Sequence, residues 1–520
     1  MIGRVNPNIS AWRGGAIGAA AGAVVVALMF GLRFSAGIQA LPDVAADAMT
    51  LVLPGSVFGY LIDRLQEYGR PSLLVGVAVG LVTLCGLLGA IAATRLVRLG
   101  HLPRAAAIVT ALAALTLPIV FLGAGDDPAG PAIATTAYWA LFAVLLEVGL
   151  SPAAARPLVA DHALERRALL LGAGALAGLW LAMYLGGRLG RAASLGGTRP
   201  TVAATLPPSP ATTPIPGATD VAPADAFPGM TGITTTKDFY VITKNGLDDP
   251  TIDAGRWRLQ VGGQRPYALG YDELRGLPVY EAPRTLECIS NIVGGSLIST
   301  ALFAGPPLKD LLERAGLPAG TKEIRFNCAD GYTESLPLDA AFDPTTIVAH
   351  TMNGEPLSKE HGFPARLLLS GRYGVKNPKW LSALVPLAQP YNGYWEQRGW
   401  NKDAFVRTFS RLDLPQDGAV VPAGGPYPFI RGVGYAGSRG ISKVEISFDG
   451  GRTWDTTQLR RVLPRDNWMP FTYIWTPPGP GAYEVVVRAY DGDGAVQDAS
   501  ERDSFPDGAT GLHRTSIKVA

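Results

Sequence analysis

The first third of the chain carries a series of apolar runs long enough to cross a lipid bilayer. A transmembrane helix needs roughly 17–25 mostly apolar residues, and the runs that meet this length are approximately Gly14–Gly31, Pro71–Ala93, Ala105–Ala124, Pro131–Leu150 and Ala168–Gly187. A further run, Met49–Leu61, is shorter and contains Pro54, so we expect an interfacial or re-entrant segment there. The sequence therefore predicts an α-helical membrane region of about five spans over residues 1–192.

Loop charges orient the predicted spans, because cytoplasmic loops carry an excess of Lys and Arg. The loop with Arg95, Arg98 and Arg104 is expected inside, and the loop with Asp126 and Asp127 is expected outside. An odd number of crossings then places the N-terminus inside and everything after the last span on the extracytoplasmic side of a bacterial cytoplasmic membrane. The loop after the first span also carries arginines and fits this orientation less well.

Two arginines, Arg166 and Arg167, directly precede the last predicted span. They are either an ordinary orientation signal or a twin-arginine (Tat) export signal inside the chain. The twin-arginine pathway moves folded domains. It would be needed if the soluble half received a cofactor in the cytoplasm before export.

The composition excludes several functions. The formal net charge is only +2, so nothing in the charge balance favours nucleic acid. His101 and His162 lie in predicted loops, so we expect no intramembrane haem, and no Cys-x-x-Cys motif offers a c-type haem or zinc site. Cys85 lies in an apolar run, which leaves Cys288 and Cys328 as the one conceivable disulfide. Cys328 lies in a predicted strand and is most simply a core residue.

The rest of the chain divides by its pattern. Residues 193–235 are rich in Pro, Ala and Thr and predict an extended linker. Over 236–414, short strand-like runs alternate with helical patterns such as Leu308–Ala315, which closes on Gly316, and this indicates an α+β domain. Over 415–520, alternating strands with Gly/Asp turns predict an all-β, immunoglobulin-like sandwich.

Cys288 lies at the centre of the run from Arg284 to Gly295. Apolar residues lead into it and Gly294-Gly295 follow it, so the sequence predicts a strand end that runs into a tight loop. Two interpretations stay open on these residues alone. The thiol is either a small buried hydrophobic group or a reactive group aimed into a cleft.

Several segments of the soluble half stand in a distinctive order. They are Phe239-Tyr240, Trp257-Arg-Leu-Gln-Val261, Thr285-Leu-Glu-Cys-Ile-Ser-Asn291, Met352-Asn-Gly-Glu-Pro-Leu357, His361-Gly-Phe-Pro-Ala-Arg366, Lys379-Trp380-Leu381 and the stretch from Gly440 to Trp454. Taken together, this ordered set over about residues 237–520 resembles the sulfite-oxidase family of molybdopterin-dependent oxidoreductases.

The resemblance implies a molybdenum–molybdopterin cofactor and two-electron oxo transfer. Molybdenum accepts soft thiolate ligands, so Cys288 would be the metal ligand. The anionic phosphate of the pterin needs buried cations with directed donors. The resemblance implies that His361, Arg366 and Lys379 bind the cofactor, with Lys376 and Asn291 as weaker candidates. It also implies that Trp400 forms a wall of the substrate pocket.

The departures from the family pattern concern the substrate. Sulfite oxidases usually continue the cysteine loop as Cys-Ala-Gly-Asn-Arg-Arg, whereas here Cys288 is followed by Ile-Ser-Asn-Ile-Val. The resemblance implies an entry strand that begins at Phe239-Tyr240. This strand, Tyr240–Lys244, also lacks an arginine, and Trp400 stands where the family has Tyr. A dianion in a dry pocket needs fixed cations. The expected substrate is therefore a small molecule, either sulfite-like or sulfoxide-like. If the substrate is an anion, Arg372, Arg398 or Arg439 could replace the missing arginines.

The partners follow from the same comparison. No haem domain is fused to the soluble half, so electrons are expected to pass to or from a separate carrier. The spans imply contact with membrane lipid, and the C-terminal domain implies a homodimer. The competing interpretation is a cofactor-free, membrane-anchored binding or assembly module that retains the fold.

Overall fold

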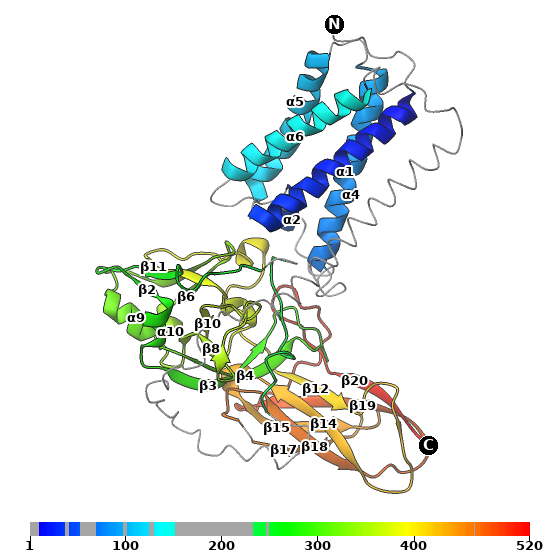
Figure 1. Cartoon of the computed structure of the whole chain (residues 1–520). Coiled ribbons are helices and arrows are strands. Elements are labelled where there is room, and N and C mark those ends of the chain that lie inside the picture. Colours follow the sequence, from blue (N-terminus) through cyan, green and yellow to red (C-terminus); the bar gives the residue numbers. More distant parts are fainter. Residues whose placement is uncertain are drawn as a thin grey trace. The chain divides into compact units, whose positions relative to one another are not determined.

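The computed structural model describes residues 10–36, 41–52, 69–96, 101–123, 129–150, 232–245, 249–461 and 463–520. These residues form two compact units, one of N-terminal helices and one that holds residues 249–520 (Figure 1). Each unit has its own buried apolar core.

The N-terminal unit is helical throughout its described residues. Its helices are α1 (Ala11–Ala36), α2 (Leu41–Val52), α4 (Gly69–Thr94), α5 (His101–Gly123) and α6 (Ala129–Leu150). Four segments are long and apolar enough to cross a membrane: Ala11–Arg33, Ser72–Thr94, Leu102–Leu122 and Ala129–Leu150. They coincide with four of the predicted spans. The fifth, Ala168–Gly187, and the Arg166-Arg167 pair lie outside the described residues.

Helix α2 is a short amphipathic helix that the sequence did not predict at this position. It covers only the beginning of the expected interfacial segment Met49–Leu61, and the remainder of that segment lies outside the described residues. Leu41 and Val44 pack into the helical core. Asp43 pairs with Arg33 of α1 at 2.8 Å, so the helix is also fixed by charge.

Helices α1 and α4 touch backbone to backbone. A Cβ atom on Gly89 would lie 2.2 Å from the Gly14 carbonyl oxygen, and one on Gly18 would lie 2.3 Å from the Cys85 carbonyl oxygen. Real side chains cannot occupy such positions. Small residues at this spacing let two helices approach closely where no hydrophobic effect drives them together. We call this contact the glycine seam, defined by Gly14, Gly18, Cys85 and Gly89.

Helices α5 and α6 are joined by polar contacts. The guanidinium of Arg104 is fully buried and donates to both carboxylate oxygens of Glu147, through Nε at 2.5 Å and through Nη2. The Trp139 indole nitrogen donates to Thr116 Oγ1 at 2.9 Å. The sequence placed Arg104 in a loop, but α5 begins at His101 and carries this arginine in its first turn.

The second unit begins with a sheet-rich domain. Its strands form a five-stranded sheet of order β2-β1-β11-β5-β6, a four-stranded sheet of order β3-β4-β8-β9 and a two-stranded sheet of β10 and β7. The strands are β1 (Arg258–Val261), β2 (Tyr267–Gly270), β3 (Tyr280–Glu287), β4 (Ile298–Gly305), β5 (Glu323–Cys328), β6 (Thr333–Pro337), β7 (Ile347–Ala349), β8 (Thr351–Met352), β9 (Glu355–Pro356), β10 (Arg366–Leu368) and β11 (Leu381–Leu387).

Only short helices accompany these sheets: α8 (Tyr271–Arg275), α9 (Leu308–Ala315) and α10 (Leu338–Ala341). Helix α9 has the predicted bounds. Leu308, Leu311 and Leu312 face the core at helical spacing, and the helix ends at Gly316, whose φ of 67° suits glycine.

The C-terminal domain consists of two sheets that share one core. One sheet has the order β12-β14-β18-β17 and the other β13-β20-β19-β15-β16. Their strands are β12 (Phe409–Leu414), β13 (Val420–Val421), β14 (Tyr427–Tyr435), β15 (Ile441–Ser447), β16 (Asp455–Thr456), β17 (Gln458–Leu459), β18 (Met469–Trp475), β19 (Gly481–Asp491) and β20 (Arg514–Val519). Phe471 of one sheet and Val444 of the other belong to the same buried cluster. The predicted all-β character is confirmed.

Candidate functional site

Cys288 follows the last residue of β3. The β3–β4 ladder ends at the pair Glu287 and Ile298, and the Cys288 amide donates to the Leu297 carbonyl at 2.9 Å. The thiol sulfur lies 3.0 Å from Ser290 Oγ. Burial raises the pKa of the Cys288 thiol, while the Ser290 contact lowers it. The predicted strand end and tight loop are thus present, with the thiol held by its backbone.

All three cysteines are free, so the disulfide that we considered between Cys288 and Cys328 is not formed. Cys328 is 7% exposed and belongs to the core of the sheet-rich domain, as predicted. Cys288 is the more exposed of the two thiols.

Tyr240 is a site residue that sequence reasoning missed. Phe239 and Tyr240 were expected in a strand, but no strand includes them, and the Tyr240 amide instead donates to Ser299 Oγ at 3.2 Å. A Cβ on Gly374 would lie 2.8 Å from the Tyr240 hydroxyl. Burial raises the pKa of Tyr240, the charge of Cys288 raises it further, and Arg366 lowers it. The hydroxyl therefore lies within the electrostatic field of both groups.

Three basic side chains come together beside Tyr240. Arg366, 5% exposed, donates to the carbonyls of His361 at 3.1 Å and Asn377 at 3.3 Å. Lys379 donates to the carbonyls of Ile242 at 3.2 Å and Glu360 at 2.8 Å. The His361 ring nitrogen Nε2 is 2.9 Å from the Thr236 carbonyl. We call this set the basic cluster: His361, Arg366 and Lys379.

Gly362 allows the basic cluster to form. Its φ is 105°, and a Cβ there would lie 3.0 Å from Lys379 Cβ and 3.2 Å from Arg366 Cβ. Only glycine adopts this conformation readily and leaves that space open. The two cationic side chains can therefore approach each other closely.

Burial shifts all three groups toward their neutral forms. It lowers the pKa of Lys379 to about 8, that of Arg366 to about 10 and that of His361 to about 4. Among the described residues, neither cation forms a direct ion pair with a carboxylate, and Arg366 Nε has no hydrogen-bond partner. A buried cation is costly without a compensating charge. The chemistry of the cluster therefore suits a bound anion.

Lys376 has different surroundings from the basic cluster. It is 2% exposed, and its amine donates to Glu334 Oε1 at 2.7 Å and to Glu396 Oε1. Its charge is matched by protein carboxylates. The structure thus does not bring Lys376 to the group that the sequence analysis assigned it to.

Asn291 and Trp400 are also placed by local contacts. Asn291 donates to Glu287 Oε1 at 2.9 Å and accepts from the Leu297 amide at 3.0 Å, so it braces the cysteine loop from within. Trp400 packs in the same buried cluster as Ile289, the neighbour of Cys288. Its indole nitrogen has no partner in the part of the chain that the structure describes.

Glu287 is a second residue that the sequence analysis missed. It is 3% exposed, and burial raises the pKa of its carboxyl to about 8. The feature that could have identified it in the sequence is an acidic residue at the end of a predicted strand, directly before the cysteine.

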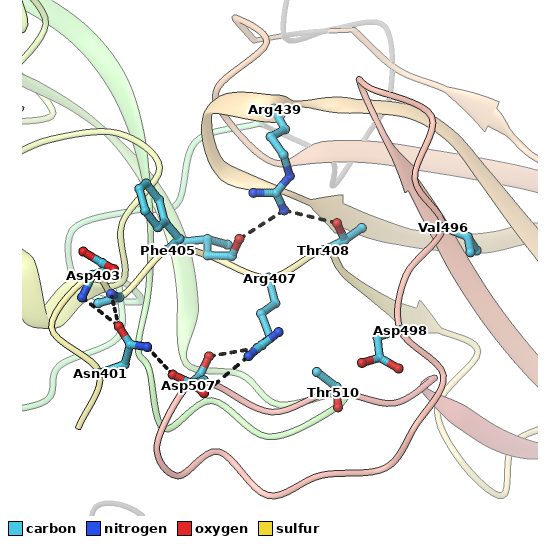
Figure 2. Close-up of a pocket in the computed structure, with 12 residues that line it drawn as sticks. Asn401, Asp403, Phe405, Arg407, Thr408, Arg439, Val496, Asp498, Asp507 and Thr510 are labelled. Carbon is cyan, nitrogen blue, oxygen red and sulfur yellow. Dashed lines mark hydrogen bonds and ion pairs between the residues drawn. The ribbon is translucent and has the colours of Figure 1, made fainter. Parts of the chain in front are cut away.

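A cavity of about 390 Å³ lies between the segment that follows Trp400 and loops of the C-terminal domain (Figure 2). Arg439 in its wall pairs with Asp491 at 3.0 Å, and Arg407 pairs with Asp507 at 3.6 Å. The Arg407 amide also donates to the Tyr373 hydroxyl at 3.2 Å, and burial, with smaller contributions from the charges of Glu287 and Cys288, raises the pKa of Tyr373. Tyr373 thus lies between this cavity and the cysteine loop.

The arginines named as possible anion ligands are already bonded. Arg372 donates to the Asp403 carbonyl and stacks on Phe405 at 3.6 Å. Arg398 donates to the Tyr394 carbonyl at 2.7 Å. With Arg439 held by Asp491, each of the three has a protein partner.

Comparison with known families matches both domains of the second unit. Residues 247–395 match the oxidoreductase molybdopterin binding domain, and residues 408–501 match the Mo-co oxidoreductase dimerisation domain.

Individual proteins are similar to part of the chain. Mitochondrial sulfite oxidase of Homo sapiens is 30% identical over 309 residues, which cover 49% of this chain and 56% of the relative. An inducible NADH nitrate reductase of Glycine max is 29% identical over 300 residues, 45% of this chain and 34% of the relative. The crystal structure of the sulfane dehydrogenase SoxCD from Paracoccus pantotrophus is 22% identical, with a TM-score of 0.45 over 52% of this chain and 77% of that one.

The chain spans about half the length of the first curated relatives it matches. The two family models fall on the domains that hold the Cys288 loop, the basic cluster and the residues that contact this loop. The second unit is thus similar, in both of its domains, to the molybdopterin oxidoreductases of the sulfite-oxidase family, and the described residues before it include four candidate membrane spans.

Proposed function

We propose that this protein is a membrane-anchored oxidoreductase that carries out two-electron oxo transfer on a small substrate, with Cys288 as the ligand of molybdenum. The observation that carries the proposal is the basic cluster beside the cysteine loop. Buried cations without carboxylate partners suit the phosphate of a molybdopterin, and a thiol at a strand end offers the soft ligand that molybdenum accepts.

The residues divide the work as follows. Cys288 would hold the metal through Sγ, and His361, Arg366 and Lys379 would hold the phosphate of the cofactor. Asn291 holds the cysteine loop through its own hydrogen bonds. Lys376 pairs with Glu334 and Glu396 rather than binding the phosphate. Trp400 contributes an apolar wall beside Ile289. When bound, the cofactor supplies the oxo-transfer chemistry, and the protein supplies orientation and electrostatics.

The charge of the surroundings favours a neutral or weakly charged substrate over a dianion. The cysteine loop contains no arginine, and Arg372, Arg398 and Arg439 are bonded within the protein. A dianion would lack fixed cationic partners. We therefore expect turnover of a neutral sulfoxide at a lower KM than sulfite, measured by steady-state kinetics with an artificial electron carrier. Efficient turnover of sulfite with a micromolar KM would contradict this assignment.

Electrons would pass to or from a separate carrier. We further propose that the N-terminus is cytoplasmic, that the second unit lies on the extracytoplasmic side, and that the C-terminal domain is an immunoglobulin-like sandwich through which two copies pair. Light scattering of the detergent-solubilised chain tests the pairing, and a monomeric mass would exclude it.

The central test is the metal content. Molybdenum near one atom per chain in protein matured in a competent host, with loss of most of it in Cys288→Ser, is the expected result, because serine does not replace a soft thiolate. Cys328→Ser is the matched control and should retain the metal, since that thiol lies in the core. Wild-type protein without molybdenum would favour the cofactor-free binding module instead.

A further inference from the structure

The loop that follows Cys288 is held by the C-terminal domain. Gly294 has a φ of 74°, and a Cβ there would lie 2.2 Å from His513 Cδ2, so the His513 ring lies against the loop backbone. The next carbonyl, that of Gly295, accepts a hydrogen bond of 2.6 Å from Arg411 Nη1.

Both contacts come from side chains that are themselves fixed. Asp413 binds Arg411 Nε at 2.6 Å, which orients the guanidinium toward the loop. The Leu412 amide donates to His513 Nδ1 at 3.1 Å, which fixes the imidazole ring against β12. A guanidinium held in this way loses little side-chain freedom when it donates to a carbonyl.

The C-terminal domain also grips the strand before Cys288. The Tyr435 hydroxyl donates to the Thr285 carbonyl at 3.0 Å, and the Trp468 amide donates to Thr285 Oγ1 at 2.9 Å. Cys288 therefore lies between two points of attachment to the same domain. The loop itself lies beyond the β3–β4 ladder and is otherwise held by its own hydrogen bonds, such as that between the Asn291 amide and the Cys288 carbonyl.

We propose that Arg411 is a positioning residue for the Cys288 thiol, and that with His513 it lets the C-terminal domain set the direction of that thiol. The proposal rests on the proposed function, in which Cys288 is the metal ligand. A catalytic group displaced by about 1 Å can lose about a hundredfold in rate, so a bond that fixes the loop matters even though it lies away from the reacting atoms.

The test compares the full-length protein with Arg411→Met, which keeps the aliphatic bulk and removes the donor. Hydrogen exchange is followed in peptides that cover residues 288–297, where the amides of Asn291 and Gly295 are bonded within the loop. We expect exchange there to accelerate about tenfold, since loss of a charge-assisted hydrogen bond favours local opening by at least that factor. Arg411→Lys keeps a cationic donor and should restore part of the protection.

Arg514→Met is the matched control, because Arg514 lies beside His513 but pairs with the exposed Glu484 at 3.0 Å, and exchange in residues 288–297 should stay at the wild-type rate. Wild-type exchange in both Arg411 variants would overturn the proposal. So would an equal acceleration over β14, β18 and β19, since the change would then act on the whole domain. Molybdenum content measured on the same samples separates the two ideas: wild type without molybdenum contradicts the proposed function and leaves the loop contact standing.

Discussion

Lys376 and Lys379 lie in one short segment, yet their amines have different surroundings. Within the described residues, Lys379 donates to backbone carbonyls, whereas Lys376 donates to the carboxylates of Glu334 and Glu396. The resemblance to the family pointed to both lysines and ranked Lys376 as the weaker candidate, but it did not reveal these different partners. The partners of Lys376 come from β6 and from the segment before Trp400, so the distinction depends on tertiary packing.

Cys288 and Tyr240 differ in how far the sequence alone could identify them. Cys288 could be singled out because glycines follow it and an ordered set of segments surrounds it. Tyr240 could not, because the irregular backbone that turns its hydroxyl toward Arg366 and Gly374 has no local pattern. A strand-like run of aromatic and β-branched residues predicted the wrong backbone there.

Replacing Lys376 by Met should destabilise the soluble unit by about 3–5 kcal/mol, because two buried carboxylates would lose their common cation. Burial and the nearby Glu396 carboxylate raise the pKa of Glu334, whereas the charge of Lys376 lowers it, so the negative charge of Glu334 depends on this cation. The free energy of unfolding in urea measures the change.

Lys402→Met is the matched control for this prediction. The Lys402 amine pairs with Glu323 at 2.8 Å but its side chain is 32% exposed, so its loss should cost less than about 1 kcal/mol. Equal losses of unfolding free energy in the two variants would contradict the prediction, because the ion pairs of Lys376 would then stabilise the fold no more than a partly exposed pair.

At the scale of elements, strongly periodic segments were predicted well. Helix α9 has its predicted bounds, whereas β19 alternates as expected only from Val487 to Asp491, because Val485, Val486 and Val487 are all buried. The four long N-terminal helices of the described residues, α1, α4, α5 and α6, followed from apolar length alone, whereas α2 was not predicted. Their packing did not, since the glycine seam needs glycines on α1 and α4 to face each other, and sequence spacing within one helix does not reveal the partner helix.

The glycine seam makes a sharp prediction for α4. Gly89→Leu should push α1 and α4 apart and lower the free energy of unfolding by about 1–3 kcal/mol, the usual range for overpacking a close contact. Thermal unfolding of the detergent-solubilised chain is the measurement.

Gly80→Leu on the same helix is the control, because a Cβ at Gly80 would meet nothing within 4 Å. A lowered unfolding temperature for Gly89→Leu alone is expected. Similar behaviour of the two variants would mean that α1 and α4 are not in contact at this point.

At the scale of the whole molecule, the order of the parts could be predicted from composition and motif order. Apolar spans precede a Pro/Ala/Thr-rich stretch, an α+β domain and an all-β domain. The contacts by which the β domain holds the cysteine loop could not be predicted. Arg411 and His513 are far from Cys288 in the chain, and neither belongs to a segment that suggested a role.

The proposed extracytoplasmic position of the second unit gives a prediction for the whole chain. Exchanging Arg166 and Arg167 for lysines keeps the charge that is expected to orient the predicted last span, but removes the pair that the twin-arginine pathway reads. We expect the soluble domains to remain in the cytoplasm, where protease added to spheroplasts does not reach them.

Lysines in place of Arg95 and Arg98 provide the control and should leave the soluble domains accessible to protease. Normal export of the Arg166/Arg167 variant would show that the pair only orients the span.

The pairing of Arg104 with Glu147 has a consequence for how the protein is made. Arg104 lies in the first turn of α5 and Glu147 lies near the end of α6, so in a membrane both charges would lie toward the interface and not at the centre, where an arginine costs roughly 2.5–3.5 kcal/mol. The ion pair joins these two ends of consecutive helices. If α5 and α6 cross the membrane, entering the bilayer as one helical hairpin would let the two charges pair as they leave water.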